Sequence, residues 1–196
     1  LTGLLAWLGM LAIEYKTNAN GPLNNPVAEK LDIIIDPVAF NKLQTFRKHS
    51  VKQGYLYRPE DAYVPIKVKY EDHTYRARAR LKGFLADHWA GNKWSLRIIV
   101  RGDFTIAGMK KFSIHAPHTR SHLGGWFLYR LGKELGGMWL KNGFFKVSIN
   151  GEEKGAYFFE ERFTKNLVER NKYREGPIFR LMDAQGFHHK FDSSVH

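Results

Sequence analysis

Two basic segments near the middle of the sequence could bind phosphate. Arg80 and Lys82 fall on the same face of an alternating segment, and Gly83 follows them. Cationic side chains and free backbone N–H groups are what proteins use to bind phosphate oxygens. Lys93 opens a second alternating segment, Lys-Trp-Ser-Leu-Arg-Ile, and a strand lysine holds nucleotide phosphates in kinase-like enzymes. Each segment taken alone also fits an ordinary strand whose cations face water.

A third segment combines a turn signal with carboxylates. Asn150-Gly151 is the pair that a two-residue hairpin turn prefers, and Gly155 indicates a bulge or a close backbone approach. Glu160 and Glu161 stand at the end of the second strand of this hairpin. A carboxylate at that place either accepts hydrogen bonds from a ligand or caps the next helix. Capping is the expectation for Glu160, and Glu161 is open to both roles.

The sequence gives little support to metal or covalent chemistry. His118 and His122 stand four residues apart at the expected start of a helix, a spacing that can place two imidazoles on one metal ion. Only His115 or a distant acid could be a third ligand, so we predict no metal site. The absence of cysteine excludes disulfides, thiolate zinc sites and a cysteine nucleophile. The glycine motifs of serine hydrolases, P-loop enzymes and dinucleotide-binding folds are also missing.

Hydrophobic periodicity predicts the elements that must position these residues. Several segments alternate apolar and polar side chains, as half-buried strands do, and Asp36-Pro37 is a typical helix start. The expected strands are 31–35, 62–70, 74–82, 93–101, 111–115, 144–149, 154–159 and 177–182, and the expected helices are 37–53, 119–135 and 161–171. Because strands and helices do not alternate, this order predicts an α+β domain with an antiparallel sheet.

Composition and charge set further bounds. The 196 residues are 43% hydrophobic, which is enough for one domain with a core. The 31 basic and 19 acidic residues give a formal charge of +12, a field that attracts polyanions or phosphate-bearing ligands. The alternative is a basic surface that is merely solvated. The basic residues form no long run, so nucleic acid is not the expected partner.

The N-terminal region differs from the rest of the chain. Residues 1–13 carry no charge but are fewer than the roughly 20 apolar residues that a membrane span needs. We expect a truncated signal peptide or membrane anchor over residues 1–16, with a buried helix as the alternative. Residues 17–29 are rich in Asn, Gly and Pro and are typical of a linker. The folded domain should therefore begin near Lys30.

Taken in order, the three segments resemble the CotH kinase family, the atypical protein kinases similar to spore coat protein H. The family pattern runs from Arg-x-(Lys/Arg)-Gly through a Lys-x-Ser strand to a helix that ends in Leu-Gly, here Leu135-Gly136. It continues with Asn-Gly-Glu-x-x-Gly-x-Tyr-x-x-x-Glu, here residues 150–161, and Gly-x-(Leu/Ile)-(Tyr/Phe)-(Lys/Arg), here residues 176–180. The match covers about residues 31–182.

The sequence departs from the family pattern at two positions. Thr164 stands where the family usually has Asp, and Phe84 stands where a small polar residue is common. The catalytic and magnesium-binding aspartates of the family lie further toward the C-terminus than residue 196. We therefore expect the catalytic residues outside this chain.

The resemblance implies a fold and an activity. The fold is a kinase-like small lobe over residues 30–182, with an antiparallel sheet, one long helix and flanking helices, and residues 183–196 begin an incomplete C-terminal part. The activity is transfer of phosphate from ATP, with Mg²⁺, to hydroxyl groups of a protein or another polymer. The implied location is outside the cytoplasm or in the cell envelope, and the expected N-terminal anchor would place the protein at a membrane.

The resemblance also implies which residues bind the nucleotide: Arg80, Lys82, Gly83, Lys93, Glu134 and Glu161. The cations contact the phosphates, and Glu134 orients the lysine from its helix. Glu161 and a hinge at residues 159–161 border the adenine pocket. The alternative function is a noncatalytic module that binds an anionic polymer or surface through the basic strand face.

Overall fold

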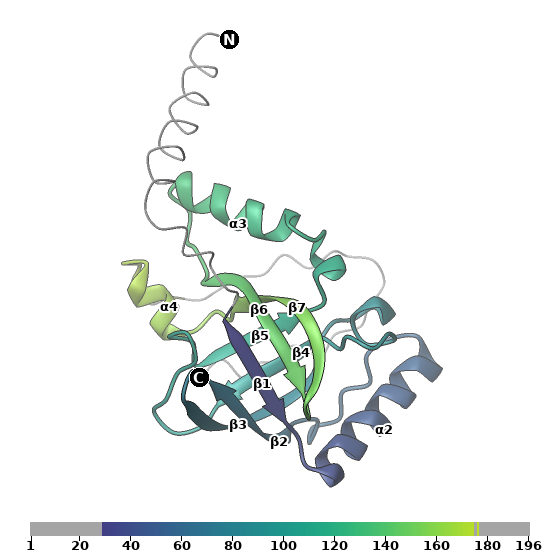
Figure 1. Cartoon of the computed structure of the whole chain (residues 1–196). Helices are drawn as coiled ribbons and strands as arrows, with labels where there is room; N and C mark the ends of the chain where they lie inside the picture. The colour runs from purple at the N-terminus through teal and green to yellow at the C-terminus, as the bar shows by residue number, and fades with distance from the viewer. Residues whose placement is uncertain (1–28, 175, 177–196) are drawn as a thin grey trace.

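The computed structural model describes residues 29–174 and 176, and these form a closed β-barrel (Figure 1). Around the barrel the strands follow the order β1-β2-β3-β4-β5-β7-β6. They are β1 (Lys30–Ile34), β2 (Val64–Tyr70), β3 (His73–Leu81), β4 (Leu96–Val100), β5 (Lys111–His115), β6 (Asn142–Ile149) and β7 (Glu152–Glu161). All neighbouring strands are antiparallel except β1 and β6, which are parallel.

Helices and short turns lie outside the barrel. They are α2 (Pro37–Gln53), η1 (Ala86–His88), η2 (Pro117–Arg120), α3 (Gly124–Glu134) and α4 (Lys165–Arg170). The helix α2 packs against β2 and β3, and α3 packs against β6. Asp36 caps α2 by accepting the Ala39 N–H at 3.0 Å, and Gly54 ends the helix in the left-handed conformation. The predicted bounds of this helix are confirmed.

The interior of the barrel is the hydrophobic core, and its outer wall is polar. In β2, the side chains of Val64, Ile66 and Val68 are buried, whereas the residues between them are exposed. This follows from strand geometry, because successive side chains point to opposite faces. The same alternation places Arg80 of β3 and its cross-strand partner Arg97 of β4 on the outer wall.

The predicted kinase-like small lobe is wrong. Instead of an antiparallel sheet with one long helix and flanking helices, the described residues form a mixed barrel of seven strands. The barrel closes because β1 pairs with β2 on one edge and with β6 on the other. The parallel β1–β6 pair joins segments that are far apart in the sequence, and such a pairing leaves no local pattern to read.

The helix predicted over residues 119–135 begins later than expected. Ser121 and His122 have φ angles of 52° and 56°, a left-handed conformation that a right-handed helix cannot contain. The helix α3 therefore starts at Gly124, after the separate turn η2. His122 no longer shares a helix with His118, and within the described residues no group of three or more His, Asp or Glu could hold a metal ion.

Several predictions fall outside the part of the chain that the structure describes. These are the anchor or signal over residues 1–16, most of the linker over residues 17–29, the strand 177–182 and the segment 183–196. In the described part of the chain, none of the helices combines the length and apolar character that crossing a bilayer requires.

The hairpin between β6 and β7 has the predicted turn and also helps to close the barrel. Asn150 and Gly151 have φ angles of 51° and 84°, as the type I′ turn requires. Gly155 has a φ of 73° beside a register shift in the ladder, which confirms the predicted bulge. The Asn150 Oδ1 accepts the Ile35 N–H at 2.7 Å, and the Asn150 N–H donates to the Ile33 carbonyl at 2.8 Å. The turn is thereby bonded to the β1 strand.

Replacing Asn150 should separate its two contributions to stability. Asn150→Ala loses the side-chain acceptor and places alanine in a left-handed conformation, so it should lower the free energy of unfolding by about 2–4 kcal/mol. Asn150→Gly keeps the backbone freedom and loses only the hydrogen bond, so about 1–2 kcal/mol is expected. Urea denaturation of the three proteins measures both values. Equal stability of Asn150→Ala and wild type would contradict this role of the turn.

Candidate functional site

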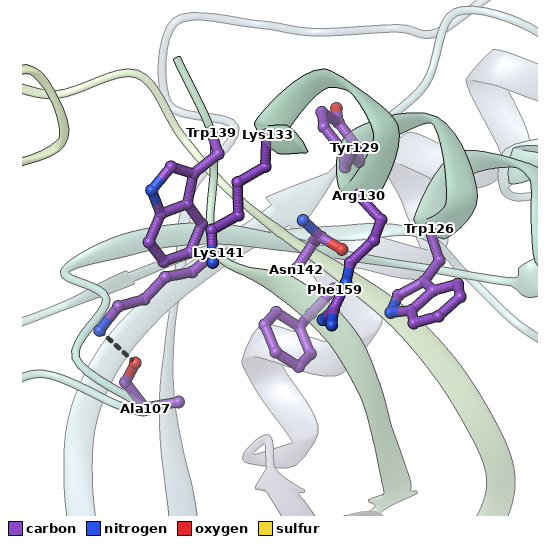
Figure 2. A pocket seen from close by; sticks show the side chains of 9 residues that line it. All are labelled: Ala107, Trp126, Tyr129, Arg130, Lys133, Trp139, Lys141, Asn142 and Phe159. Carbon is purple, nitrogen blue, oxygen red and sulfur yellow. Dashed lines mark hydrogen bonds between the residues drawn. The ribbon is translucent and has the colours of Figure 1, made fainter. Parts of the chain in front are cut away.

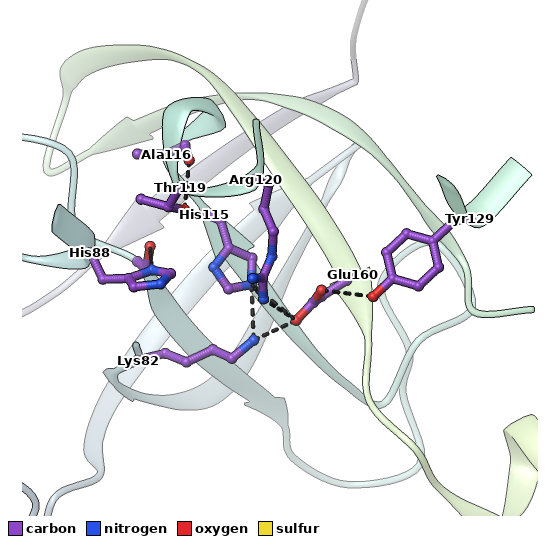
Figure 3. A network of polar contacts seen from close by, with 9 residues as sticks. Lys82, His88, His115, Ala116, Thr119, Arg120, Tyr129 and Glu160 are labelled. Carbon is purple, nitrogen blue, oxygen red and sulfur yellow. Dashed lines mark hydrogen bonds and ion pairs between the residues drawn. The ribbon is translucent and has the colours of Figure 1, made fainter. Parts of the chain in front are cut away.

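A cluster of charged side chains centres on Glu160 on the outer wall of the barrel (Figure 3). The Oε1 atom of Glu160 accepts hydrogen bonds from Lys82 Nζ and, at 3.1 Å, from Arg120 Nη2. The same oxygen lies 3.1 Å from His115 Nε2. The Oε2 atom accepts a hydrogen bond from the Tyr129 hydroxyl at 3.1 Å. One carboxylate therefore joins side chains from β5, η2 and α3 and from Lys82, the residue just after β3.

Strand pairing and a chain reversal bring these side chains together. In the β5–β7 pair, Ser113 lies opposite Glu160. Lys82 directly follows β3, and its backbone N–H donates to the Ser95 carbonyl at 2.9 Å just before β4 begins. The chain then leaves β5 and turns back over the sheet in η2, which places Arg120 on the carboxylate.

Burial changes the protonation of the cluster. The side chains of Lys82 and Glu160 are only 15% and 13% exposed, and that of His115 is fully buried. Loss of hydration lowers the pKa of Lys82 to about 8, although the charge of Glu160 opposes the shift. Burial also lowers the pKa of His115 to about 4, so this imidazole is neutral at neutral pH. Burial alone would raise the pKa of Glu160, but the His115 hydrogen bond and the Lys82 charge hold it below its ordinary value.

The contacts of His115 favour one tautomer. Its Nδ1 is buried without a hydrogen-bond partner among the described residues, whereas its Nε2 faces Glu160. A proton on Nε2 satisfies the carboxylate and leaves no buried N–H unpaired. The Lys82 ammonium lies 2.9 Å from the same Nε2. Because that nitrogen carries a proton and cannot accept, Lys82 donates its hydrogen bond to Glu160.

A second group of cations lies beside the Glu160 cluster. Arg80 is almost fully buried; its Nη1 donates to the Leu81 carbonyl at 2.9 Å, and its guanidinium lies 5.3 Å from the Tyr63 ring centroid. Arg97, its cross-strand neighbour, is half-buried, and its Nε has no hydrogen-bond partner among the described residues. Burial, followed by the charges of Arg80 and Arg162, lowers the pKa of Arg97 to about 10.

The two groups form one positively charged surface, which we call the cationic wall. It consists of Arg80, Lys82, Arg97, Arg120 and Arg162, and within the described part of the chain Glu160 is the one carboxylate that contacts these cations. A buried charge is costly unless a group of opposite charge compensates it. Since one carboxylate cannot neutralise five cations, the wall is suited to binding an anion with several oxygens.

Of the residues on the two basic segments that are predicted to bind nucleotide, only some lie in the cationic wall. Arg80 and Lys82 belong to the cationic wall. Gly83 has a φ of 100°, and a Cβ added there would lie 2.0 Å from His88 Cγ, so its missing side chain allows the chain to pass close to η1. Lys93 extends over Tyr157, with its Nζ 5.9 Å from the ring centroid.

The two predicted glutamates lie apart from Lys82. Glu134 is exposed at the last residue of α3. Glu161 is buried and accepts the Lys141 N–H and the Arg170 Nη1, each at 3.1 Å, so it links β7 to α4. Residues 159–161 are the end of the strand β7 and not a hinge: Phe159 and Glu160 pair with β5 and β6, and Glu161 pairs with Phe112 of β5.

Sequence reasoning missed the glutamate that contacts Lys82. The capping role predicted for Glu160 is wrong, because Thr164 occupies the N-cap of α4 and the Glu160 carboxylate points into the cluster. Alternation along β5 could have placed His115 on the same strand face as Ser113. Ser113 is the residue that lies opposite Glu160 in the β5–β7 pair. No local signal predicts Arg120, because its position depends on the reversal of the chain in η2.

Comparison with known proteins does not assign the chain to a family. No protein-family model matches it, and no curated protein sequence matches it. The resemblance to CotH kinases therefore rests on the motifs alone, and the function that it implies stays a prediction.

Replacing His115 should change how stability depends on pH. The native pKa of His115 is about 4, below its ordinary value of 6.5, so the unfolded chain binds more protons between these pH values. The stabilisation is therefore complete above pH 6.5 and is lost as the pH falls toward 4, by about 3 kcal/mol at most. His115→Gln should remove this loss and flatten the free energy of unfolding in that range.

Urea denaturation at several pH values between 4 and 7 measures this dependence. The matched control is His49→Gln, because His49 is an exposed histidine of α2. The control should follow the wild-type curve. If His115→Gln showed the same slope as wild type, then His115 would not be held neutral in the native protein.

Proposed function

We propose that the cationic wall binds the phosphate groups of ATP, and that the chain is the nucleotide-binding portion of a kinase that transfers phosphate to hydroxyl groups of a protein or another polymer. One observation carries the proposal. Arg97 is a half-buried guanidinium that neighbours two further arginines and has an Nε without a partner among the described residues. A polyphosphate bound at the terminal nitrogens of Arg97 would supply the negative charge that offsets its two arginine neighbours.

The cations of the wall suit different parts of this task. The guanidinium of Arg97 is planar and can bind two phosphate oxygens at once. Lys82 is held in place by Glu160, and with a pKa of about 8 it is mostly protonated at neutral pH. A bound phosphate would add negative charge beside Lys82 and raise that pKa. The wall is therefore prepared to bind phosphate oxygens without a large rearrangement.

The Lys82–Glu160 pair supports the kinase reading of the sequence. Protein kinases hold a strand lysine with a glutamate so that the ammonium can reach the ATP phosphates. Here the lysine follows β3 and the glutamate comes from the strand β7, rather than from the helix that carries Glu134. The proposal therefore keeps the phosphate-binding role of the lysine without requiring a kinase-like small lobe.

Phosphoryl transfer also needs a divalent metal ion and a base for the attacking hydroxyl. Within the described residues, no group of three or more His, Asp or Glu could hold a metal ion. We therefore assign phosphate binding alone to the wall, and the resemblance assigns Mg²⁺ and the base to aspartates elsewhere in the enzyme. The proposed setting, which follows from the resemblance and the apolar N-terminal segment, is the cell envelope or the space outside the cytoplasm.

A second candidate function is binding of an anionic polymer without catalysis. Lys67 of β2 lies opposite Arg76 of β3, and these two residues and Arg78 are exposed on the outer wall. Exposed cations of this kind bind polyanions with little specificity and with a strong dependence on salt. This candidate predicts that each cation contributes about equally, whether it is exposed or half-buried.

Three charge-removing variants distinguish the two candidates. Lys82→Gln and Arg97→Gln each remove a cation of the wall, whereas Arg76→Gln removes an exposed cation from the same face of β3. Calorimetric titration with ATP should show about a tenfold or greater loss of affinity for the first two variants, because charge-assisted hydrogen bonds to phosphate disappear. The Arg76→Gln control should stay within about twofold of wild type.

The Arg97→Gln variant also tests whether the Arg97 charge lowers the stability of the folded protein. Among the described residues Arg97 forms no ion pair, and Arg80 and Arg162 repel its charge, so Arg97→Gln should not lower the thermal unfolding midpoint. Equal losses of ATP affinity in all three variants would contradict a phosphate site and favour the polymer-binding candidate.

A further inference from the structure

A cavity of about 230 Å³ lies between α3 and the start of β6 (Figure 2). The described residues that line it carry aromatic rings, three cations and one amide, and none of them is a carboxylate. They are Ala107, Trp126, Tyr129, Arg130, Lys133, Trp139, Lys141, Asn142 and Phe159. Such a lining suits a flat ring that is attached to negatively charged groups.

The two tryptophan rings that line the cavity each contact a cation of α3. In Figure 2, Trp139 and Trp126 stand at opposite sides of the cavity, with Phe159 between them. Lys133 Nζ lies 4.7 Å from the centroid of the Trp139 ring, and Arg130 Cζ lies 6.0 Å from that of Trp126. The cations that contact the two indoles therefore also give the cavity its positive charge.

Asn142 supplies a directional polar group. Its Nδ2 donates to the Leu140 carbonyl at 2.7 Å, and this bond fixes the orientation of the amide. Among the described residues no hydrogen bond is made to its Oδ1, although the side chain lines the cavity. The Oδ1 can accept a hydrogen bond from an exocyclic amine, such as that of adenine.

Tyr129 contacts both the cavity and the Glu160 cluster. Its ring lines the cavity, and its hydroxyl donates to Glu160 Oε2 at 3.1 Å. Asn142, on the same side of the barrel, pairs with Glu160 in the β6–β7 register. A molecule with a ring in the cavity could therefore extend charged groups past Tyr129 to the cationic wall.

We propose that this cavity binds the base of the nucleotide whose phosphates occupy the cationic wall. The inference rests on the proposed function, and it identifies Trp126, Trp139 and Asn142 as the residues that recognise the base. The volume is below the roughly 300–1,000 Å³ of sites that enclose a whole drug-sized ligand. It therefore suits one ring system, with the sugar and phosphates outside.

Titration of the full chain with three probes tests the proposal. ATP carries base and phosphates, tripolyphosphate carries only phosphates, and adenosine carries only base and sugar. Trp126→Leu and Trp139→Leu should each lower ATP affinity about 5-fold to 100-fold, because stacking on the base is lost, and should leave tripolyphosphate affinity unchanged. The control is Trp94→Leu, because that indole stacks on Phe40 of α2 with ring centroids 5.6 Å apart. It should change neither affinity.

The outcomes separate this inference from the proposed function. If ATP and tripolyphosphate bind wild type equally and the cavity variants change neither, the cavity does not bind the base, while the phosphate site stands. If adenosine binds through the two tryptophans and tripolyphosphate does not bind, the base site stands and the phosphate site fails. Unchanged tripolyphosphate affinity in a variant also shows that it has folded, so a selective loss of ATP affinity supports the inference.

Discussion

The carboxylate of Glu160 connects side chains from β5, η2, α3 and the residue after β3 on the outer wall of the barrel. Lys82, Arg120 and Tyr129 donate to it, and His115 contacts it from within the sheet. These contacts attach η2 and α3 to the strands and leave the cluster mostly buried. The buried carboxylate is stable because Lys82 and Arg120 compensate its charge and donate hydrogen bonds to it. The arrangement of the wall and of the adjoining cavity depends on this single acidic residue.

Closure of the barrel explains why the polar groups gather outside it. The seven strands fill the interior with apolar side chains, and no open edge remains for a ligand to pair with. Functional side chains must then stand on the outer wall or at the rim. The reversal of the chain after β5 covers part of that wall with η2 and α3. The covered part is where Lys82 and Glu160 lose most of their exposure, and where the cavity with Trp126 and Trp139 forms.

Local chemistry made much of the fold predictable from the sequence. The alternation around Val64 to Tyr70, the Asp36 cap and the Asn150-Gly151 turn each depend on neighbouring residues, and each is confirmed. The parallel β1–β6 pair could not be predicted, since it depends on two segments that are distant in the sequence. The closed barrel was missed for the same reason.

The site was predicted only in part, for a related reason. The pattern placed Arg80 and Lys82 on one strand face, but alternation does not show which elements cover that face. The left-handed residues Ser121 and His122 redirect the chain before α3, and this reversal brings in Arg120 and Tyr129. The resemblance therefore indicates Glu134 on the helix as the residue that orients a phosphate-binding lysine, whereas the structure pairs Lys82 with Glu160 on the strand β7.

The protonation of Lys82 tests the account most directly, because it depends on burial, on Glu160 and on bound phosphate together. The measurement is an NMR titration of the Lys82 side chain, with and without tripolyphosphate, assigned by comparison with Lys82→Gln. The account predicts a pKa near 8 in the free protein, which rises when tripolyphosphate binds. A Lys82 pKa at the ordinary value of 10.5 that tripolyphosphate leaves unchanged would contradict both the buried cluster and the phosphate site.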